Sequence, residues 1–107
     1  MKRGDIVRAA GPGDYTGKPR PALIVQSDIF DAHNSITICP ITSILSETLL
    51  FRVPVGPGEA NGLLKPSEIE VDKITTIARG KIRGVIGRMD DERMVLVDAA
   101  LRRWLGL

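Results

Sequence analysis

Short runs of alternating apolar and polar residues fill most of this chain. Runs that are rich in Val, Ile and Thr and bounded by Gly, Pro, Asn or Asp are typical of β-strands. The pattern predicts six or seven short strands, and the main ones are Asp5–Ala9 and residues 22–26, 35–40, 49–55, 68–72 and 73–79. Residues 22–26 are apolar throughout, so this strand is expected at the centre of the sheet.

Helical spacing occurs only near the C-terminus, where it predicts one helix from Asp91 to Leu105. Asp90 is a suitable N-cap, the first turn is acidic, and Gly106 is suited to end the helix. The apolar stripe of this helix consists of Met94, Val97, Ala100, Leu101, Trp104 and Leu105. The stripe is expected to pack on the core or at a dimer interface.

Gly- and Pro-rich segments separate the predicted strands, and they indicate long turns at residues 10–19 and 56–62. Residues 80–88 are read as a basic connection because Gly80, Gly84 and Gly87 interrupt them. The predicted fold is therefore mainly β with a C-terminal α-helix. We expect a small, closed or nearly closed antiparallel barrel, with the helix covering one opening.

Length and composition narrow the class of protein. A chain of 107 residues predicts a single domain over residues 1–107, large enough for a core without metals or disulfides. The one cysteine, Cys39, lies in an apolar strand and is expected to be buried, with a reactive thiol as the alternative. The start of the chain shows no signal-peptide pattern and no run is long enough to span a bilayer, so we expect a cytosolic protein.

The net charge of +2 and the pI near 9.0 permit an anionic partner without requiring one. Aromatic residues make up only 4% of the chain, so base stacking cannot carry most of any RNA binding. One histidine and one cysteine cannot form an ordinary transition-metal site, and neither a metal nor another cofactor is expected. Scattered carboxylates that hold Mg²⁺ remain an alternative.

Two polar residues at strand ends are the main candidates for chemistry. Arg20 lies between Pro19 and Pro21, so its backbone is held extended at the start of the central strand. Thr42 follows the apolar strand that ends near Pro40. We expect both side chains to converge on one phosphate. The alternatives are a structural salt bridge for Arg20 and a strand-end cap for Thr42.

Other candidates are weaker. Glu70 and Asp72 are expected on one face of an alternating strand, where they are either a general base or substrate contact or a solvated edge. The long first loop is either a flexible flap that carries Asp14 and Tyr15 or a connection without a role. His33 lies in a polar loop, and a solvated residue is favoured over a catalytic base.

The candidates for RNA contact are Lys18, Ser43, Ser67, Arg79 and Lys81, with ordinary surface charge as the alternative for the basic ones.

Several motifs occur in an order that resembles the MazF/PemK family of toxin endoribonucleases. They cover essentially the whole chain, and each is weak evidence alone. They are RGDIV at residues 3–7, KPRPALIVQS at 18–27, CPITS at 39–43, GLLKPS at 62–67, KITTI at 73–77, and the ending at 87–107.

The resemblance implies an SH3-like barrel that forms a homodimer and cleaves single-stranded RNA without a metal. The paired catalytic Arg and Thr of the family match Arg20 and Thr42. Attack by the RNA 2′-OH would give a 2′,3′-cyclic phosphate and a 5′-OH end. The implied partner is an antitoxin whose C-terminal segment blocks the RNA groove, and Trp104 is a candidate contact for it.

This chain departs from many relatives at Lys73 and Thr75, where a Gln and an Arg are usual. Substrate preference therefore does not follow from the resemblance. Two other functions stay open: a DNA gyrase poison on the same fold, and a non-enzymatic SH3-like binding domain. Gyrase poisons of this type end in Trp-Gly, whereas Leu105 separates Trp104 from Gly106 here.

Overall fold

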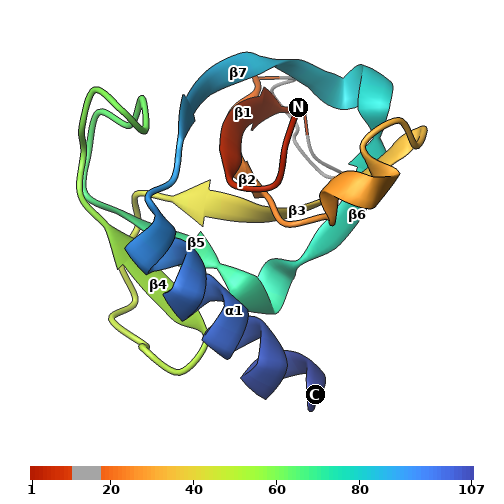
Figure 1. Cartoon of the computed structure of the whole chain (residues 1–107). Helices are drawn as coiled ribbons and strands as arrows, with labels where there is room; N and C mark the ends of the chain where they lie inside the picture. Colours follow the sequence, from red (N-terminus) through yellow and green to blue (C-terminus); the bar gives the residue numbers. More distant parts are fainter. Residues whose placement is uncertain (11–17) are drawn as a thin grey trace.

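The computed structural model describes residues 1–10 and 18–107, and Figure 1 shows a curled antiparallel sheet with one helix beside it. The strands of the described residues are β1 (Asp5–Ala9), β2 (Arg20–Ile24), β3 (Ser35–Thr42), β4 (Arg52–Val55), β5 (Ser67–Glu70), β6 (Thr75–Ala78) and β7 (Ile82–Arg88). The helices are α1 (Asp91–Leu105) and the 3-10 turns η1 (Asp28–Phe30), η2 (Val71–Lys73) and η3 (Arg79–Lys81).

Strand β3 is the centre of the sheet because it pairs along both edges. One edge pairs with β2, and the other pairs first with β6 and then with β5. The path of neighbouring strands is β4-β5-β3-β2-β1-β7. The sheet curls like a barrel, but no ladder joins the end strands β4 and β7. The predicted mainly β fold with a C-terminal helix is confirmed. Of the two predicted forms, a closed or a nearly closed barrel, the sheet has the nearly closed one.

Alternation along the central strands divides the core into two clusters. Cys39 and Ile41 of β3 point to the cluster that contains Leu23, Ile69 and the helix residue Val97. The neighbouring positions on β3 point the other way, into the cluster of Val7, Ala9, Ala22, Ile24, Ile36, Ile38 and Ile77. Ala22, Leu23 and Ile24 of β2 are buried on both faces of the sheet, in agreement with the continuous apolar run in the sequence.

The helix α1 covers the first cluster, and its ends are those that the sequence predicts. The Asp90 side chain accepts a hydrogen bond from the Arg93 N–H, and Gly106 takes the left-handed conformation that ends the helix. Val97 and Ala100 are completely buried, whereas Trp104 and Leu105 are half exposed. The last turn of the predicted apolar stripe therefore lies outside the core. No helix of the described residues is long and apolar enough to cross a bilayer.

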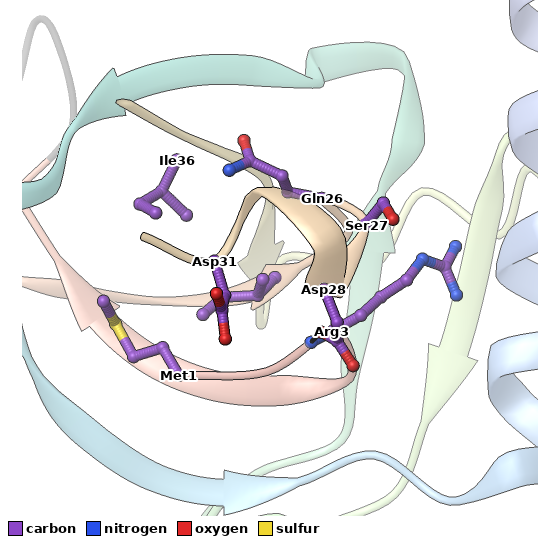
Figure 2. A pocket seen from close by; sticks show the side chains of 8 residues that line it. Met1, Arg3, Gln26, Ser27, Asp28, Asp31 and Ile36 are labelled. Carbon is purple, nitrogen blue, oxygen red and sulfur yellow. Dashed lines mark hydrogen bonds between the residues drawn. The ribbon is translucent and has the colours of Figure 1, made fainter. Parts of the chain in front are cut away.

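The N-terminus is tied to the helix by Arg3. Figure 2 shows this side chain extending from the wall of a small cavity of about 10 Å³ toward the helix. Its guanidinium donates to the Asp98 carboxylate at 2.5 Å and to the Val25 carbonyl at 3.0 Å. The Arg3 backbone N–H donates to Asp28. This cavity holds no more than a water molecule, so its role is structural.

Two predicted segments differ from the structure. Residues 82–88 form strand β7 instead of a basic connection, and this strand pairs with β1 through two register shifts. The predicted strand at 68–72 ends at Glu70, and Asp72 lies in η2. Residues 43–48, which connect β3 toward β4, contain no helix.

Candidate active site

The pairing of β2 with β3 brings Arg20 and Thr42 to the same edge of the sheet. The register pairs Ala22 with Pro40, Leu23 with Cys39, and Ile24 with Ile38. Arg20 and Thr42 each lie two residues beyond the last pair, at the end of their strands, and the same register continued by two residues would bring them opposite each other. Directly opposed residues have Cβ atoms about 4.5–5.5 Å apart. The two side chains also share the face that carries Ala22 and Ile38.

A cavity of 330 Å³ lies beside Arg20. Its apolar walls come from the ends of β1, β2 and β3, and its polar side chains are Arg20, Lys73 and Thr75. The two positions at which this chain departs from many relatives therefore lie beside Arg20. Arg20 is exposed and makes no ion pair or side-chain hydrogen bond with any described residue. A structural salt bridge for Arg20 is thus absent from the described part of the chain.

Thr42 is half-buried, and its hydroxyl is partly used by the following turn. The Ile44 N–H donates to Thr42 Oγ1 at 3.1 Å. This bond is the strand-end cap that the sequence left as an alternative, but it occupies only an acceptor position. The hydroxyl hydrogen remains available for a substrate oxygen. Ser43 follows directly and is exposed.

The acidic residues of β5 and η2 surround Arg52 instead of facing solvent. Arg52 forms a two-point interaction with Asp72, with Nε 2.6 Å and one terminal nitrogen 3.1 Å from its carboxylate. Its other terminal nitrogen lies 3.4 Å from Glu70 Oε2 and 3.8 Å from Glu68 Oε1. Only 13% of the Arg52 side chain is exposed. The prediction of one solvated strand face is therefore wrong, because the strand ends at Glu70 and Arg52 covers these carboxylates.

This cluster changes the proton affinity of its members. The hydrogen bond from Arg52 holds the pKa of Asp72 below its ordinary value, against the opposing effect of burial. Burial alone would raise the pKa of Glu68, but the N–H groups of Ser46 and Glu47 and the Ser46 hydroxyl outweigh it. The pKa of Glu68 is therefore lowered too. Both carboxylates are ionised at neutral pH.

The predicted RNA contacts fall into two groups. Lys18, Ser43 and Lys81 are exposed. Ser67 is buried and donates to the Lys65 carbonyl at 2.9 Å, so its hydroxyl does not face a substrate. Arg79 donates to the carbonyls of Asp31 and His33 and holds that turn in place. These placements favour the first group as substrate contacts.

The remaining candidates are placed as follows. The predicted flap residues Asp14 and Tyr15 lie outside the described residues. His33 is an exposed loop residue whose Nδ1 accepts the Ser35 N–H at 3.0 Å. Trp104 is 48% exposed, and its ring lies 5.5 Å from the ring of Phe51. In the described ranges, no group of three or more His, Cys, Asp or Glu side chains is arranged to hold a metal ion.

Arg52 and Glu68 are the residues of this region that sequence reasoning missed. Arg52 lies in an otherwise apolar run, and the opposing run of acidic residues was the available signal. In the structure these strands are paired, with Arg52 opposite Glu70 and Pro54 opposite Glu68. Opposite charges on paired strands are a common form of cross-strand stabilisation.

The fold and the site define a small β protein with an Arg–Thr pair at a strand edge, suited to binding a phosphodiester. The model of the PemK-like, MazF-like toxins of type II toxin–antitoxin systems matches residues 2–105. The chain belongs to this family, as the sequence motifs predict.

Known proteins support this assignment. The chain is 44% identical over 107 residues to a probable endoribonuclease MazF from Mycolicibacterium smegmatis, covering 100% of this chain and 98% of the relative. The fold is similar to that of the Mycobacterium tuberculosis toxin MazF-mt6, with a TM-score of 0.82 and 26% identity over 96% of this chain and 97% of the toxin. A mycobacterial endoribonuclease in complex with its cognate antitoxin shares the fold, with a TM-score of 0.82 and 22% identity over 100% and 96% of the chains.

Proposed function

We propose that this toxin is an endoribonuclease that cuts single-stranded RNA with Arg20 and Thr42. The prediction of an RNA-cleaving toxin is confirmed by the family match and by the 44% identical relative, which is named as an endoribonuclease. The observation that supports the site is the β2–β3 pairing, whose last pair, Ala22 with Pro40, lies two residues from both Arg20 and Thr42, and Arg20 lines a cavity of 330 Å³. Neither a gyrase poison nor an adaptor would need this pair.

The proposed reaction uses the 2′-OH of the RNA as its nucleophile. This oxygen loses its proton to the general base and attacks the adjacent phosphorus. The bond to the 5′-oxygen breaks and that oxygen takes up a proton, which gives a 2′,3′-cyclic phosphate and a 5′-OH. The charged Arg20 guanidinium grips two phosphate oxygens and stabilises the charge that develops on them, an effect worth roughly 3 kcal/mol. The Thr42 hydroxyl, which uses a lone pair for Ile44, donates its hydrogen to the phosphate or orients the 2′-OH.

Glu70 is assigned as the general base because Lys73 links it to the cavity and Arg52 contacts it at one point, 3.4 Å away, rather than at two. Asp72 is bound at two points by Arg52 and its pKa is lowered, so it is a weak proton acceptor. Glu70 Oε2 lies 3.4 Å from Lys73 Nζ, and Lys73 lines the cavity beside Arg20. Lys73 thus links this carboxylate to the site, and we include it with Lys18, Ser43 and Lys81 among the RNA contacts.

A homodimer and an antitoxin complete the proposal. Trp104 and the neighbouring Phe51 present aromatic surface at the end of α1, where an antitoxin side chain can bind. A protein of the same fold is known in complex with its cognate antitoxin. We place the activity in the cytosol, where messenger RNA is accessible.

The test is to incubate the purified protein with a long single-stranded RNA in EDTA and to map new 5′ ends by primer extension. We expect discrete cuts with 5′-OH ends, and none with Arg20→Ala. Arg8→Ala is the matched control, because Arg8 is an exposed arginine on the adjacent strand that pairs with Pro21 and faces the other way. Intact RNA with the wild-type protein, or equal cutting by Arg20→Ala, would contradict the proposal.

A further inference from the structure

The turn that follows Thr42 is fastened to one buried carboxylate, that of Glu68. The Ser46 N–H and the Ser46 hydroxyl both lie 3.0 Å from Glu68 Oε1, and the Glu47 N–H lies 2.9 Å from Oε2. Glu68 itself is 2% exposed and stands directly opposite Thr42 in the pairing of β3 with β5. One side chain therefore contacts the turn four and five residues beyond Thr42.

This turn has a conformation that needs support. Glu47 has a φ of +60°, in the left-handed region that residues other than glycine seldom adopt. Its N–H and that of Ser46 point at the same carboxylate, which compensates for the strain. At the other end of the turn, the Ile44 N–H is fixed by Thr42 Oγ1. The segment from Thr42 to Glu47 is thus held at both ends.

Burying a charged carboxylate costs desolvation free energy, which must be offset by an ion pair and by hydrogen bonds. Arg52, 3.8 Å away, balances the charge of Glu68, but all the hydrogen bonds that the carboxylate accepts come from the turn. An apolar residue at this position would fill the same core space and would leave the turn free. The turn directly continues the strand end that carries Thr42 and Ser43.

We propose that Glu68 is a positioning residue, which fixes the turn at residues 43–47 and so orients Thr42 and Ser43 toward the scissile phosphate. This inference rests on the proposed function. Orientation of a reacting group contributes strongly to catalysis, and a displacement of about 1 Å can reduce the rate roughly a hundredfold. Glu68 does not contact the reacting atoms in this proposal, so its effect should appear in kcat rather than in RNA binding.

Glu68→Gln is the first test, because the amide keeps the size of the side chain but sets an NH₂ group against one of the two N–H donors. We expect kcat to fall by about tenfold to a hundredfold. The Kd for an uncleavable RNA with 2′-deoxy substitution at the cut site should stay within about twofold. Amide hydrogen exchange at Ser46 and Glu47, measured by NMR, should become faster.

Asp98→Asn is the matched control, because it weakens the ion pair with Arg3, far from the turn in sequence. It should lower the melting temperature and leave kcat unchanged. If Glu68→Gln does not fold, Ser46→Ala takes its place, since Ser46 is exposed and its hydroxyl contacts only Glu68, at 3.0 Å, and the Thr48 N–H, at 3.5 Å, among the described residues. A severalfold fall in kcat is expected for that variant.

The outcomes separate this inference from the proposed function. Active wild-type protein and a folded Glu68→Gln variant with wild-type kcat would overturn the positioning role alone. The same conclusion would follow if kcat fell in Asp98→Asn as far as in Glu68→Gln. Wild-type protein that leaves RNA intact would overturn the proposed function and the positioning role with it.

Discussion

Two arginines of this chain show how surroundings distinguish a structural side chain from one that we propose as catalytic. Arg52 is enclosed by Glu68, Glu70 and Asp72, and these carboxylates balance its charge within the protein. Arg20 is exposed beside a cavity and is engaged by no carboxylate of the described residues. An arginine whose charge is not balanced by a carboxylate of the described residues, such as Arg20, is available to bind a phosphate. The residue type alone would not have distinguished Arg20 from Arg52.

The Thr42 hydroxyl can be tested apart from its methyl group. Thr42→Val keeps the shape and should reduce RNA cleavage by about a hundredfold or more, because the donor that orients the phosphate is lost. Thr42→Ser should retain most of the activity. Loss of the bond from Ile44 should lower the free energy of unfolding of the Val variant by only about 1 kcal/mol.

Single-turnover cleavage and urea unfolding measure these two effects separately. Equal activity of the Val and wild-type proteins would show that Thr42 only caps the strand. A loss of activity that follows the loss of stability in both variants would point to the same conclusion.

At the scale of elements, the local signals in the sequence were sufficient for the helix and most strands. Asp90, the apolar stripe and Gly106 predict α1 with its observed bounds, because capping and amphipathic spacing are local properties. Strand β7 could not be predicted, because its glycines resemble turn residues. Gly87 is required by its close contact with the distant residue Asn61, which no local pattern records, whereas Gly84 has a positive φ of 148°.

The site was predictable only in part for the same reason. The positions of Arg20 and Thr42 at strand ends follow from the prolines and the apolar runs around them. The buried cluster at Arg52 depends on which strands are neighbours, and the anchoring of the turn by Glu68 depends on a strand that is more than 20 residues away. These are properties of topology rather than of sequence pattern.

Gly87 provides a test of the close approach between β7 and the turn at residues 56–62. A Cβ on Gly87 would lie 2.2 Å from the carbonyl carbon of Asn61, so Gly87→Ala must displace backbone. We expect it to lower the free energy of unfolding by about 2 kcal/mol or more. Gly80→Ala is the control, because a Cβ there meets no atom within 4 Å. Similar unfolding midpoints for the two variants in urea would contradict this account.

At the scale of the whole molecule, several exposed apolar side chains lie near the end of α1. Leu49 and Leu50 are about two-thirds exposed, at 66% and 68%, and Leu105 is about half exposed, beside the aromatic surface proposed for the antitoxin. Arg103 Nε donates to the Leu50 carbonyl, so these segments are neighbours. Exposed apolar surface of this kind commonly marks an interaction site.

We therefore expect a dimer in solution at micromolar concentration, and light scattering measures its mass directly. Leu50→Lys should weaken association, because it places a charge on this surface. The hydrogen bond from Arg103 to the backbone carbonyl of residue 50 does not depend on the side chain and should remain. The control is Leu64→Lys, since Leu64 is 92% exposed and lies on a different turn. A monomer mass for the wild-type protein would exclude the dimer, and equal effects of both variants would exclude this surface as its interface.

The pH dependence of stability follows from the carboxylates around Arg52. The folded-state pKa values of Glu68 and Asp72 lie below their ordinary values of 4.5 and 3.8. Between the ordinary and the lowered values, the unfolded chain binds more protons than the folded chain, so acid favours unfolding. The stabilisation is fully present above the ordinary values and is lost as the pH falls through the lowered ones.

Urea unfolding at a series of pH values from about 6 to about 3 should show this decline. Asp72→Asn should be less stable than wild type at neutral pH, because Arg52 loses its closest counterion. Its stability should also fall less steeply with acid, because one of the two protonation events has been removed. A slope equal to that of wild type would mean that Asp72 does not carry the effect, and would assign the acid sensitivity to the other carboxylates with lowered pKa values, which are Glu68, Asp31 and Asp90.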